Sequence, residues 1–298
     1  MSSVEAGERL GVVTVLYNSL GVLPSFVASL VAQRMERFLL YAVDNASGDG
    51  SADWLAQHPD RRIRLTRNAE NAGIAVADNQ GIRQALADGC RWILLLNNDT
   101  EFGPEFFATL IAGLEGHGAD IATPKILVHG SSPPVIWSAG GRFHRWQANR
   151  ATHDGQGQPD GPEWDRPRRT SYATGCCFLA HAAVFQKIGL LDEKFFVYFD
   201  DVDYAFRCRG ARMTIWYIPD ARLWHKVGSL TGGGASPFGM RYATLGKTCF
   251  IRKHYRPPAR WFWLGAYQLR MLAAFLRGGY SWSGYLRRQR AFREGLAR

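Results

Sequence analysis

Three aspartates within four positions are the strongest sign of chemistry in this chain. Asp200, Asp201 and Asp203 lie in the stretch FFVYFDDVDYAFRCRG, residues 195–210. Neighbouring carboxylates repel one another and raise one another's pKa, so crowding them lowers stability unless a cation or a proton-transfer task compensates. Helix capping explains one aspartate, because a short side-chain oxygen satisfies the free amides of a first helical turn. It does not explain three, and the cluster therefore indicates a general base or a cation site.

A second candidate site follows the apolar run in LLLNNDT, residues 94–100. Asp99 carries the only full negative charge there, and the end of a buried strand would hold it rigidly, which suits a hard divalent cation that bridges two phosphates. Such a site needs further ligands. Phosphate oxygens supply some, and His225 in LWHKVGS is a candidate for another. A lone histidine is more often structural, so both interpretations of His225 stay open.

Short apolar runs alternate with helical patterns across residues 11–99. The runs suited to buried strands are GVVTVLY, FLLYAV, RIRLT and RWILLL. The segments with helical spacing are VLPSFVASLVAQ, SADWLAQ and IAVADNQGIRQALADG. This alternation predicts an α/β fold with a Rossmann-like, mostly parallel sheet flanked by helices.

Polar groups follow each of these four strands. They are Tyr17 and Asn18, then DNASGDGS, RNAENAG and NNDT. Asn, Asp and Gly are common turn formers, which alone accounts for any one of these loops. The carboxyl ends of parallel strands meet at one edge of a sheet, where ligands bind, so the four together indicate a binding crevice.

The composition changes over residues 130–170, which are rich in Gly, Pro, Arg and Trp and show no helical or strand periodicity. An irregular insertion of this length is usually mobile or functional. YATGCCFLAHAAVF then predicts a buried strand that runs into a helix, and RMTIWYIP predicts another strand. We predict one domain over residues 1–235, followed by a C-terminal arm over residues 236–298.

The amino-acid composition limits the cellular compartment and the binding partners that we expect for the protein. The 298 residues are 46% apolar and carry a formal charge of +10, so the protein meets something acidic: nucleic acid, an anionic lipid surface or phosphorylated substrates. The five cysteines form no CxxC pair and are expected to be buried and reduced, which fits the cytoplasm. The acidic N-terminus argues against an ordinary signal peptide, and no window of about 18 residues lacks charge, so we expect no membrane span.

The C-terminal arm interleaves Arg and Lys with Trp, Tyr, Phe and Leu. Basic amphipathic helices with aromatic edges lie on anionic membrane surfaces. The same composition suits nucleic acid or the core of a partner subunit, which would make a homo-oligomer. The membrane interpretation is the one we favour.

The ordered motifs resemble the family 2 glycosyltransferases of the GT-A fold, especially their bacterial rhamnosyltransferase-like branch. The resemblance spans roughly residues 10–255 and rests on VVTVLYN, VDNASGDGS, RNAENAGIAVADNQGI, LLLNNDT, FFVYFDDVDYAFR and WHKVGS, in that order. It implies a nucleotide-sugar-binding half over residues 10–125 and an acceptor-binding, catalytic half over residues 126–235.

The resemblance also implies roles for single residues in donor binding. Tyr17 would pack on the pyrimidine, and Asp44 would accept the ring N–H of the base or contact the ribose. Arg67 and Asn71 would line the base and the diphosphate. Three further residues stand where the family has its Asp-x-Asp motif: Asn97, Asn98 and Asp99. Asp99 would be the metal ligand with His225, and Asn in place of the first Asp is expected to weaken binding of Mg²⁺ or Mn²⁺.

The same resemblance assigns the aspartate cluster. Asp201 would be the base that takes the acceptor proton in an inverting sugar transfer, and Asp200 would orient it. Asp203 would cap or brace the helix, and the aromatic residues before the cluster would exclude water and stack on sugars. Lys226 or an arginine would help to stabilise the departing diphosphate. Ser229 and the glycines of GSLTGGG would be either a lid over the diphosphate or a plain linker.

We therefore expect an inverting, metal-dependent glycosyltransferase that uses a dTDP- or UDP-sugar, with dTDP-L-rhamnose as the best choice. Its acceptor would be a glycan or a lipid-linked sugar in cell-surface polysaccharide synthesis, and the enzyme would sit on the cytoplasmic face of the plasma membrane. One alternative is a sugar-phosphate nucleotidyltransferase, but LYNSLGVLP is not the Gly-rich basic loop that such enzymes carry after their first strand. Another is a basic nucleic-acid-binding protein, which leaves the aspartates unexplained.

Overall fold

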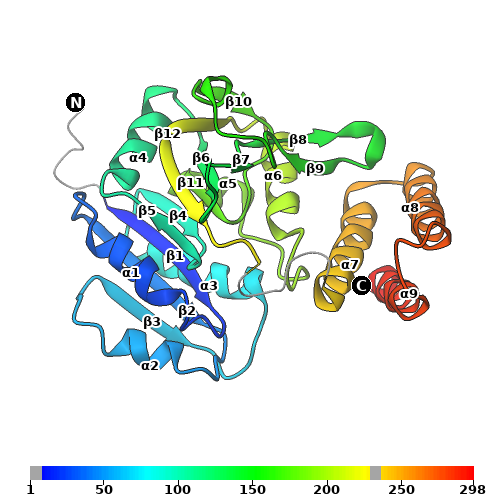
Figure 1. Cartoon of the computed structure of the whole chain (residues 1–298), viewed down its shortest axis with the longest axis horizontal. Helices are drawn as coiled ribbons and strands as arrows, with labels where there is room; N and C mark the ends of the chain where they lie inside the picture. The colour runs from blue at the N-terminus through cyan, green and yellow to red at the C-terminus, as the bar shows by residue number, and fades with distance from the viewer. Residues whose placement is uncertain (1–8, 229–235) are drawn as a thin grey trace.

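The computed structural model describes residues 9–228 and 236–298, which fold around one large twisted sheet (Figure 1). The strand order is β10-β12-β6-β11-β4-β1-β2-β3, with β5 beside β12 and β7 beside β6. A separate two-stranded ribbon, β8 and β9, projects from this body toward the C-terminal helices. Ser229 and the last three glycines of GSLTGGG, Gly232, Gly233 and Gly234, lie outside the described residues.

The N-terminal half has the predicted parallel arrangement, with β1 between β4 and β2 and with β3 at the edge. Its strands are β1 (Leu10–Leu16), β2 (Phe38–Asp44), β3 (Ile63–Arg67) and β4 (Trp92–Leu96). Its helices are α1 (Leu23–Val31), α2 (Ser51–Ala56) and α3 (Ile74–Ala87). The central strands β1 and β4 are buried on both faces, which is why they read as continuous apolar runs.

Helices cover both faces of the sheet. One apolar core holds α1, α2 and α4 (Phe106–Gly116), and a second core on the other face holds α3, α5 (Ala182–Ile188) and α6 (Asp200–Gly210). Alternate residues of β1 enter different cores: Val12 belongs to the first and Val13 to the second. The predicted layered α/β architecture is confirmed.

The second half extends the sheet with mixed directions. Strand β11 (Cys177–His181) runs antiparallel between β4 and β6 (Ile121–Val128), and β12 (Ile215–His225) runs parallel to β6. The short strand β5 (Thr100–Phe102) pairs with the end of β12 and sets Thr100 opposite His225. Residues that lie far apart in the sequence are thereby brought to the carboxyl end of β4.

The insertion over residues 130–170 is folded, although its sequence shows no periodicity. It contains β7 (Ile136–Ser138), β8 (Gly141–His144), β9 (Arg150–His153) and β10 (Arg168–Thr170). Strands of three or four residues are too short to show a pattern, and they depend on tertiary pairing. A fully buried Lys125 fastens the insertion to β6, because its Nζ lies 2.7 Å from Asp160 Oδ1 and 2.5 Å from Asp165 Oδ1.

The arm consists of α7 (Pro237–His254), α8 (Ala259–Leu276) and α9 (Trp282–Ala297). Helix α7 belongs to the second core through Leu245, Cys249 and Phe250, and α9 adds Ala291 to it. The arm thus packs against the second core, which holds α6, and Figure 1 shows it at the right of the molecule. No helix in the described part of the chain is long and apolar enough to cross a bilayer.

Candidate active site

The loops after β1 and β2 form one wall of the site and are cross-linked by hydrogen bonds. Asn18 Oδ1 accepts from the Gly48 amide at 2.8 Å, and Ser51 Oγ accepts from the Ser19 amide at 2.9 Å. Beside them, Tyr17 leaves 45% of its surface exposed, as a ring that stacks on a ligand must. The structure thus places Tyr17 at the end of β1, and its contact with a base stays a prediction.

Asp44 ends β2 and is buried, with 3% of its surface exposed. Its Oδ2 accepts from the Ser47 amide at 3.2 Å, whereas Oδ1 has no hydrogen-bond partner among the described residues. A buried carboxylate oxygen without a donor is costly in the free protein. The ring N–H of a pyrimidine is a donor of the kind that would satisfy it.

A network of amides fixes the loop that follows β3, and sequence reasoning did not single out its members. Asn68 Nδ2 donates to Asn45 Oδ1 at 2.8 Å and to Gln80 Oε1 at 3.0 Å, and Asn45 Nδ2 donates to the Gly73 carbonyl at 3.1 Å. These residues lie in VDNASGDGS and RNAENAGIAVADNQGI. The repeated Asn and Gln in these motifs were therefore the sequence signal for the amide network.

Two predicted donor-binding residues in this region make local contacts. Arg67 pairs with Asp53, Nη1 to Oδ1 at 2.7 Å, and both side chains are exposed. Such an exposed pair is weak, so Arg67 is free to turn to a diphosphate. Asn71 Oδ1 accepts from the Gly73 amide at 3.0 Å and shapes the entry to α3. Their roles in donor binding stay predictions.

The structure brings Asp99 and His225 together, although 126 positions separate them. Asp99 Oδ1 lies 3.1 Å from His225 Nε2, and both side chains are buried. Burial lowers the pKa of His225, and the neighbouring Cys176 and Asp99 raise it by more, so the net shift is upward. Burial also raises the pKa of the Cys176 thiol, which favours its neutral form.

A carboxylate oxygen and an imidazole nitrogen that face each other are a donor pair suited to a divalent cation. The remaining ligands must come from diphosphate oxygens or water, since the described residues contain no group of three or more acidic, Cys or His side chains able to hold a metal. The pair therefore fits a cation that binds together with the nucleotide.

The neighbours of Asp99 have different orientations. Asn98 is buried, and its Nδ2 donates to Val15 O at 3.0 Å and to Ser19 Oγ at 2.9 Å, so it ties β4 to the end of β1. Asn97 is half-buried, and its carbonyl accepts from Thr100 Oγ1 at 2.7 Å. The geometry gives Asn98 a structural task, and the donor-binding roles of both asparagines stay predictions.

Lys226 does not point freely at the crevice. Its Nζ lies 2.7 Å from Glu101 Oε1 and donates to Ser25 Oγ at 2.7 Å. These contacts brace the end of β12 against β5 and α1, and the expected contact of Lys226 with the diphosphate stays a prediction.

The two catalytic candidates begin α6. Asp201 Oδ2 accepts from Tyr172 Oη at 2.5 Å and from the Gly175 amide at 2.9 Å. Asp200 is 7% exposed, and burial first, then the charges of Asp201 and Asp78, raise its pKa well above its usual range. These effects favour the neutral form of Asp200, whereas the Asp201 carboxylate is held by two donors on Oδ2.

Asp203 serves the fold. It has no exposed side-chain surface and lies 2.7 Å from His254 Nε2, 2.8 Å from Lys253 Nζ and 2.9 Å from Arg207 Nε. The predicted bracing role is confirmed and the capping alternative is wrong, because α6 begins after Phe199 without a side-chain cap.

Sequence reasoning missed an aromatic bridge between the two sites. The His153 ring lies 4.5 Å from Trp137, and Trp137 lies 4.6 Å from His225. On the other side, His153 lies 5.7 Å from Tyr172, which holds Asp201. Trp137 and His153 come from the insertion, whose many aromatic residues were the only signal for them.

The loop before α6, which contains Phe196, contacts the loop before α3, which contains Gly73. The Ile74 amide donates to Phe196 O at 2.7 Å, and a side chain at Gly73 would lie 2.7 Å from the same oxygen. Gly73 has a positive φ of 90°, which glycine adopts without strain. The entry to α3 is thus fixed directly against the residues that precede Asp200.

Comparisons with known proteins agree with this geometry. Residues 11–189 match Glycosyl transferase family 2. The chain is 25% identical to the dTDP-rhamnosyl transferase RfbF of Shigella flexneri, over 72% of this chain and 68% of the relative. It is 27% identical to the N-acetylglucosaminyl-diphospho-decaprenol L-rhamnosyltransferase of Mycobacterium tuberculosis, over 88% of this chain and 91% of the relative.

Solved structures share the fold at low identity. One is GalNAc-T7 with UDP, GalNAc and Mn²⁺, with a TM-score of 0.61 and 16% identity over 83% of this chain and 50% of that one. Another is the mannosyltransferase PcManGT of Pyrobaculum calidifontis with GDP-Man and Mn²⁺, with a TM-score of 0.57 and 13% identity over 97% of this chain and 75% of that one. The predicted GT-A fold is confirmed, and the chain belongs to glycosyl transferase family 2 and is a glycosyltransferase.

Proposed function

We propose that this enzyme transfers L-rhamnose from dTDP-L-rhamnose, with inversion, to a glycan or lipid-linked acceptor in cell-surface polysaccharide synthesis. The observation that carries the proposal is the pair at the start of α6, in which Asp201 Oδ2 accepts from the Tyr172 hydroxyl and the Gly175 amide, and Asp200 is buried beside it. Family membership makes the nucleotidyltransferase and nucleic-acid-binding alternatives untenable.

The proposed reaction needs one base and one stabilised leaving group. Asp201 takes the proton of the acceptor hydroxyl while the new bond to the anomeric carbon forms and the bond from that carbon to the diphosphate breaks. Tyr172 and Gly175 fix the carboxylate, and Trp137, His153 and Tyr172 exclude water between the base and the donor. Water is the competing acceptor, so exclusion favours transfer over hydrolysis.

Asp99 and His225 would hold the divalent cation, Mn²⁺ or Mg²⁺. When bound, such a cation supplies positive charge where the departing diphosphate becomes negative. Asp44, through its unpaired Oδ1, and Tyr17, through its exposed ring, would hold the pyrimidine.

The choice of donor and acceptor is supported by the relatives. Two of them are named for rhamnosyl transfer, one from dTDP-rhamnose and one of L-rhamnose to N-acetylglucosaminyl-diphospho-decaprenol. We extend both properties to this chain as part of the proposal. A UDP-sugar remains the alternative donor, because uracil and thymine differ by one methyl group.

The arm supports a position on the inner face of the plasma membrane. Apolar side chains that are more than 60% exposed gather on α8 and the start of α9: Trp261, Phe262, Leu269, Leu276 and Trp282. Trp146, at the tip of the β8–β9 ribbon, is 91% exposed. Arginines of α8 and α9 lie among these side chains, and basic helices with exposed aromatic residues bind anionic lipid surfaces. This is the source of the proposed cytoplasmic, peripheral location.

Diphosphate release tests the function. The purified enzyme is given dTDP-L-rhamnose, UDP-glucose, UDP-galactose or GDP-mannose, with an N-acetylglucosaminyl diphospholipid of short chain and with Mn²⁺, Mg²⁺ or EDTA. We expect release of dTDP that depends on both the acceptor and the cation. A preference for another donor would overturn the rhamnosyl assignment, and release that is unaffected by EDTA would overturn the metal-dependent mechanism.

A further inference from the structure

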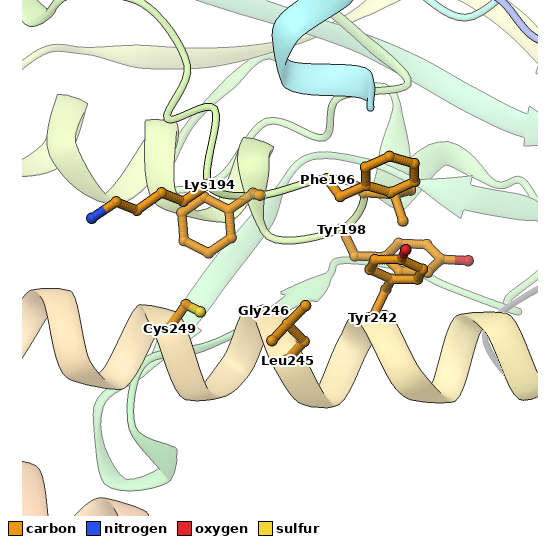
Figure 2. A pocket seen from close by; sticks show the side chains of 9 residues that line it. Lys194, Phe196, Tyr198, Tyr242, Leu245, Gly246 and Cys249 are labelled. Carbon is orange, nitrogen blue, oxygen red and sulfur yellow. The ribbon is translucent and has the colours of Figure 1, made fainter. Parts of the chain in front are cut away.

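Helix α7 presents aromatic rings to the loop that carries the catalytic aspartates. Phe238, Tyr242, Leu245, Gly246 and Cys249 share one face of the helix, at spacings of three, four and one positions. Figure 2 shows Tyr242 rising from α7 toward the loop that contains Phe196 and Tyr198. Helix α7 lies beyond residues 11–189, which match the family, so nothing in the family match assigns it to the site.

The rings on the two elements are in contact. Tyr242 stacks on Phe196 with ring centroids 5.0 Å apart and planes at 22°, and Phe238 lies 4.7 Å from Tyr242. Phe238 is 42% exposed, while Phe196, Tyr198 and Tyr242 are half-buried. These four residues, named here the aromatic platform, form a surface that solvent reaches and that extends across both elements.

A close fit holds α7 in this place. A side chain at Gly246 would lie 2.7 Å from the Phe199 ring, so glycine is what allows the helix to approach. Tyr198 and Phe199 have φ values of 61° and 70°, a region that aromatic residues seldom adopt, and packing must hold them there. Phe199 directly precedes Asp200, so α7 supports the turn that sets both aspartates.

The platform also borders the donor side of the site. Phe196 O accepts from the Ile74 amide at the start of α3, immediately after the amide network of the donor loop. An acceptor must bring its hydroxyl to Asp201 without entering the nucleotide pocket. A surface between the donor loop, the start of α6 and α7 meets that requirement.

We propose that Phe238 and Tyr242 of α7, together with Phe196 and Tyr198, form an acceptor subsite that binds the apolar face of a pyranose ring. The C–H bonds on one face of a sugar pack on the electron-rich face of an aromatic ring, which buries apolar area that would otherwise be hydrated. This inference rests on the proposed function and adds the acceptor side of the site. It also gives the arm a part in recognition.

Saturation-transfer NMR tests the subsite without knowledge of the natural acceptor. The probes are methyl glycosides of glucose, galactose, N-acetylglucosamine and rhamnose, added to the full chain with dTDP and Mn²⁺. Farnesyl phosphate is a separate probe for an isoprenoid chain. The Kd of dTDP is measured by calorimetry in every variant, and thermal melting checks the fold.

We expect the wild-type protein to bind at least one glycoside, and Phe238→Ala and Tyr242→Ala each to weaken that binding about fivefold to tenfold. Tyr242→Phe keeps the ring and should stay within about twofold of wild type. Phe262→Ala is the control, because it removes an exposed aromatic ring from α8, outside the platform. The Kd of dTDP should be the same in all four variants.

Several results would overturn the subsite: a wild-type protein that binds dTDP but no glycoside, Ala variants that bind glycosides normally, or variants that lose farnesyl phosphate and keep the glycosides. Phe238 is largely exposed, so Phe238→Ala remains informative if Tyr242→Ala unfolds. A wild-type protein that does not bind dTDP would contradict the proposed function itself, which distinguishes the two failures.

Discussion

The Tyr172 hydroxyl donates a hydrogen bond of 2.5 Å to Asp201 Oδ2, which joins the carboxyl end of the insertion to the first turn of α6. The Gly175 amide donates to the same oxygen at 2.9 Å. Two donors on one oxygen hold the carboxylate in a fixed orientation, while burial raises the pKa of Asp200, one residue earlier. Neighbouring carboxyl groups in such different environments can take separate roles in catalysis.

Replacing the two aspartates should separate those roles. Asp201→Asn cannot accept a proton, so turnover should fall by roughly two to four orders of magnitude. Asp200→Asn resembles the neutral acid already present, so we expect a loss of less than about tenfold. Steady-state kinetics with nucleotide binding as the control measure this, and the Kd of dTDP should be unchanged in both variants. If Asp200→Asn is the more damaging change, the base is Asp200.

Tyr172→Phe tests whether the hydrogen bond positions Asp201. The ring and its packing remain, and only the donor to Oδ2 is lost, so we expect kcat to fall about tenfold with unchanged donor KM. A change in melting temperature with normal kcat would instead assign Tyr172 to stability alone.

Asp99→Asn should remove the effect of the cation on nucleotide affinity. In the wild type, Mn²⁺ is expected to tighten dTDP binding, because the cation would be shared by Asp99, His225 and the diphosphate. Calorimetric titration of dTDP with and without Mn²⁺ measures this difference. Asn98→Asp is the comparison variant. It adds a carboxylate beside the site, and it also removes the hydrogen bonds that Asn98 donates to Val15 and Ser19. Retained Mn²⁺ dependence in Asp99→Asn would exclude Asp99 as a ligand.

Asp203→Asn should destabilise the fold by about 3 kcal/mol, because Arg207, Lys253 and His254 lose a fully buried carboxylate partner. Burial raises the pKa of Asp203, but hydrogen bonds from His254 and Lys253 lower it by more. A pKa that is lower in the folded state than in the unfolded state stabilises the protein above the unfolded pKa of about 4. This stabilisation is lost as pH falls through the folded pKa. The melting-temperature gap between wild type and variant should therefore be full at neutral pH and shrink below pH 4.

Asp192→Asn is the control for that series. Asp192 also pairs with Lys253 at 2.7 Å, but its side chain is 23% exposed, so its loss should cost less than about 1 kcal/mol. Equal losses of unfolding free energy in the two variants would contradict the larger stabilising role that we assign to the buried Asp203.

The membrane surface is testable without truncating the arm. Truncation would expose the core that α9 shares with α7, whereas Trp261 and Phe262 are 62% and 64% exposed and can be changed to Ser safely. We expect Trp261→Ser with Phe262→Ser to weaken binding to anionic vesicles at least tenfold, and salt to weaken binding of the wild type. Val31→Ser, on the exposed side of α1, is the control. Vesicle binding that ignores both changes would favour an oligomer interface.

The parallel half of the fold was predictable because its signals are local. Strands β1, β2 and β4 are buried on both faces, and apolar runs such as WILLL reflect that burial directly, whereas the edge strand β3 is only partly buried. The loops at their carboxyl ends follow from the same rule, so Tyr17, Asp44 and Asp99 were placed at one edge before any contact was known. The insertion gave no such signal, since its short strands form only by pairing with distant ones.

The sequence by itself determined which side chains carry chemistry. Residue type identifies the carboxylates, histidines and amides, and the order of the motifs shows which strand each one follows. The spacing of Asp200, Asp201 and Asp203 did not separate them, and their different expected roles came only from the family resemblance. Tertiary structure decided that Asp200 is buried with a raised pKa, that Asp201 accepts from Tyr172, and that Asp203 binds the arm. The physical reason is that protonation and hydrogen bonding depend on burial and on partners from elsewhere in the chain, and neither is encoded in local spacing.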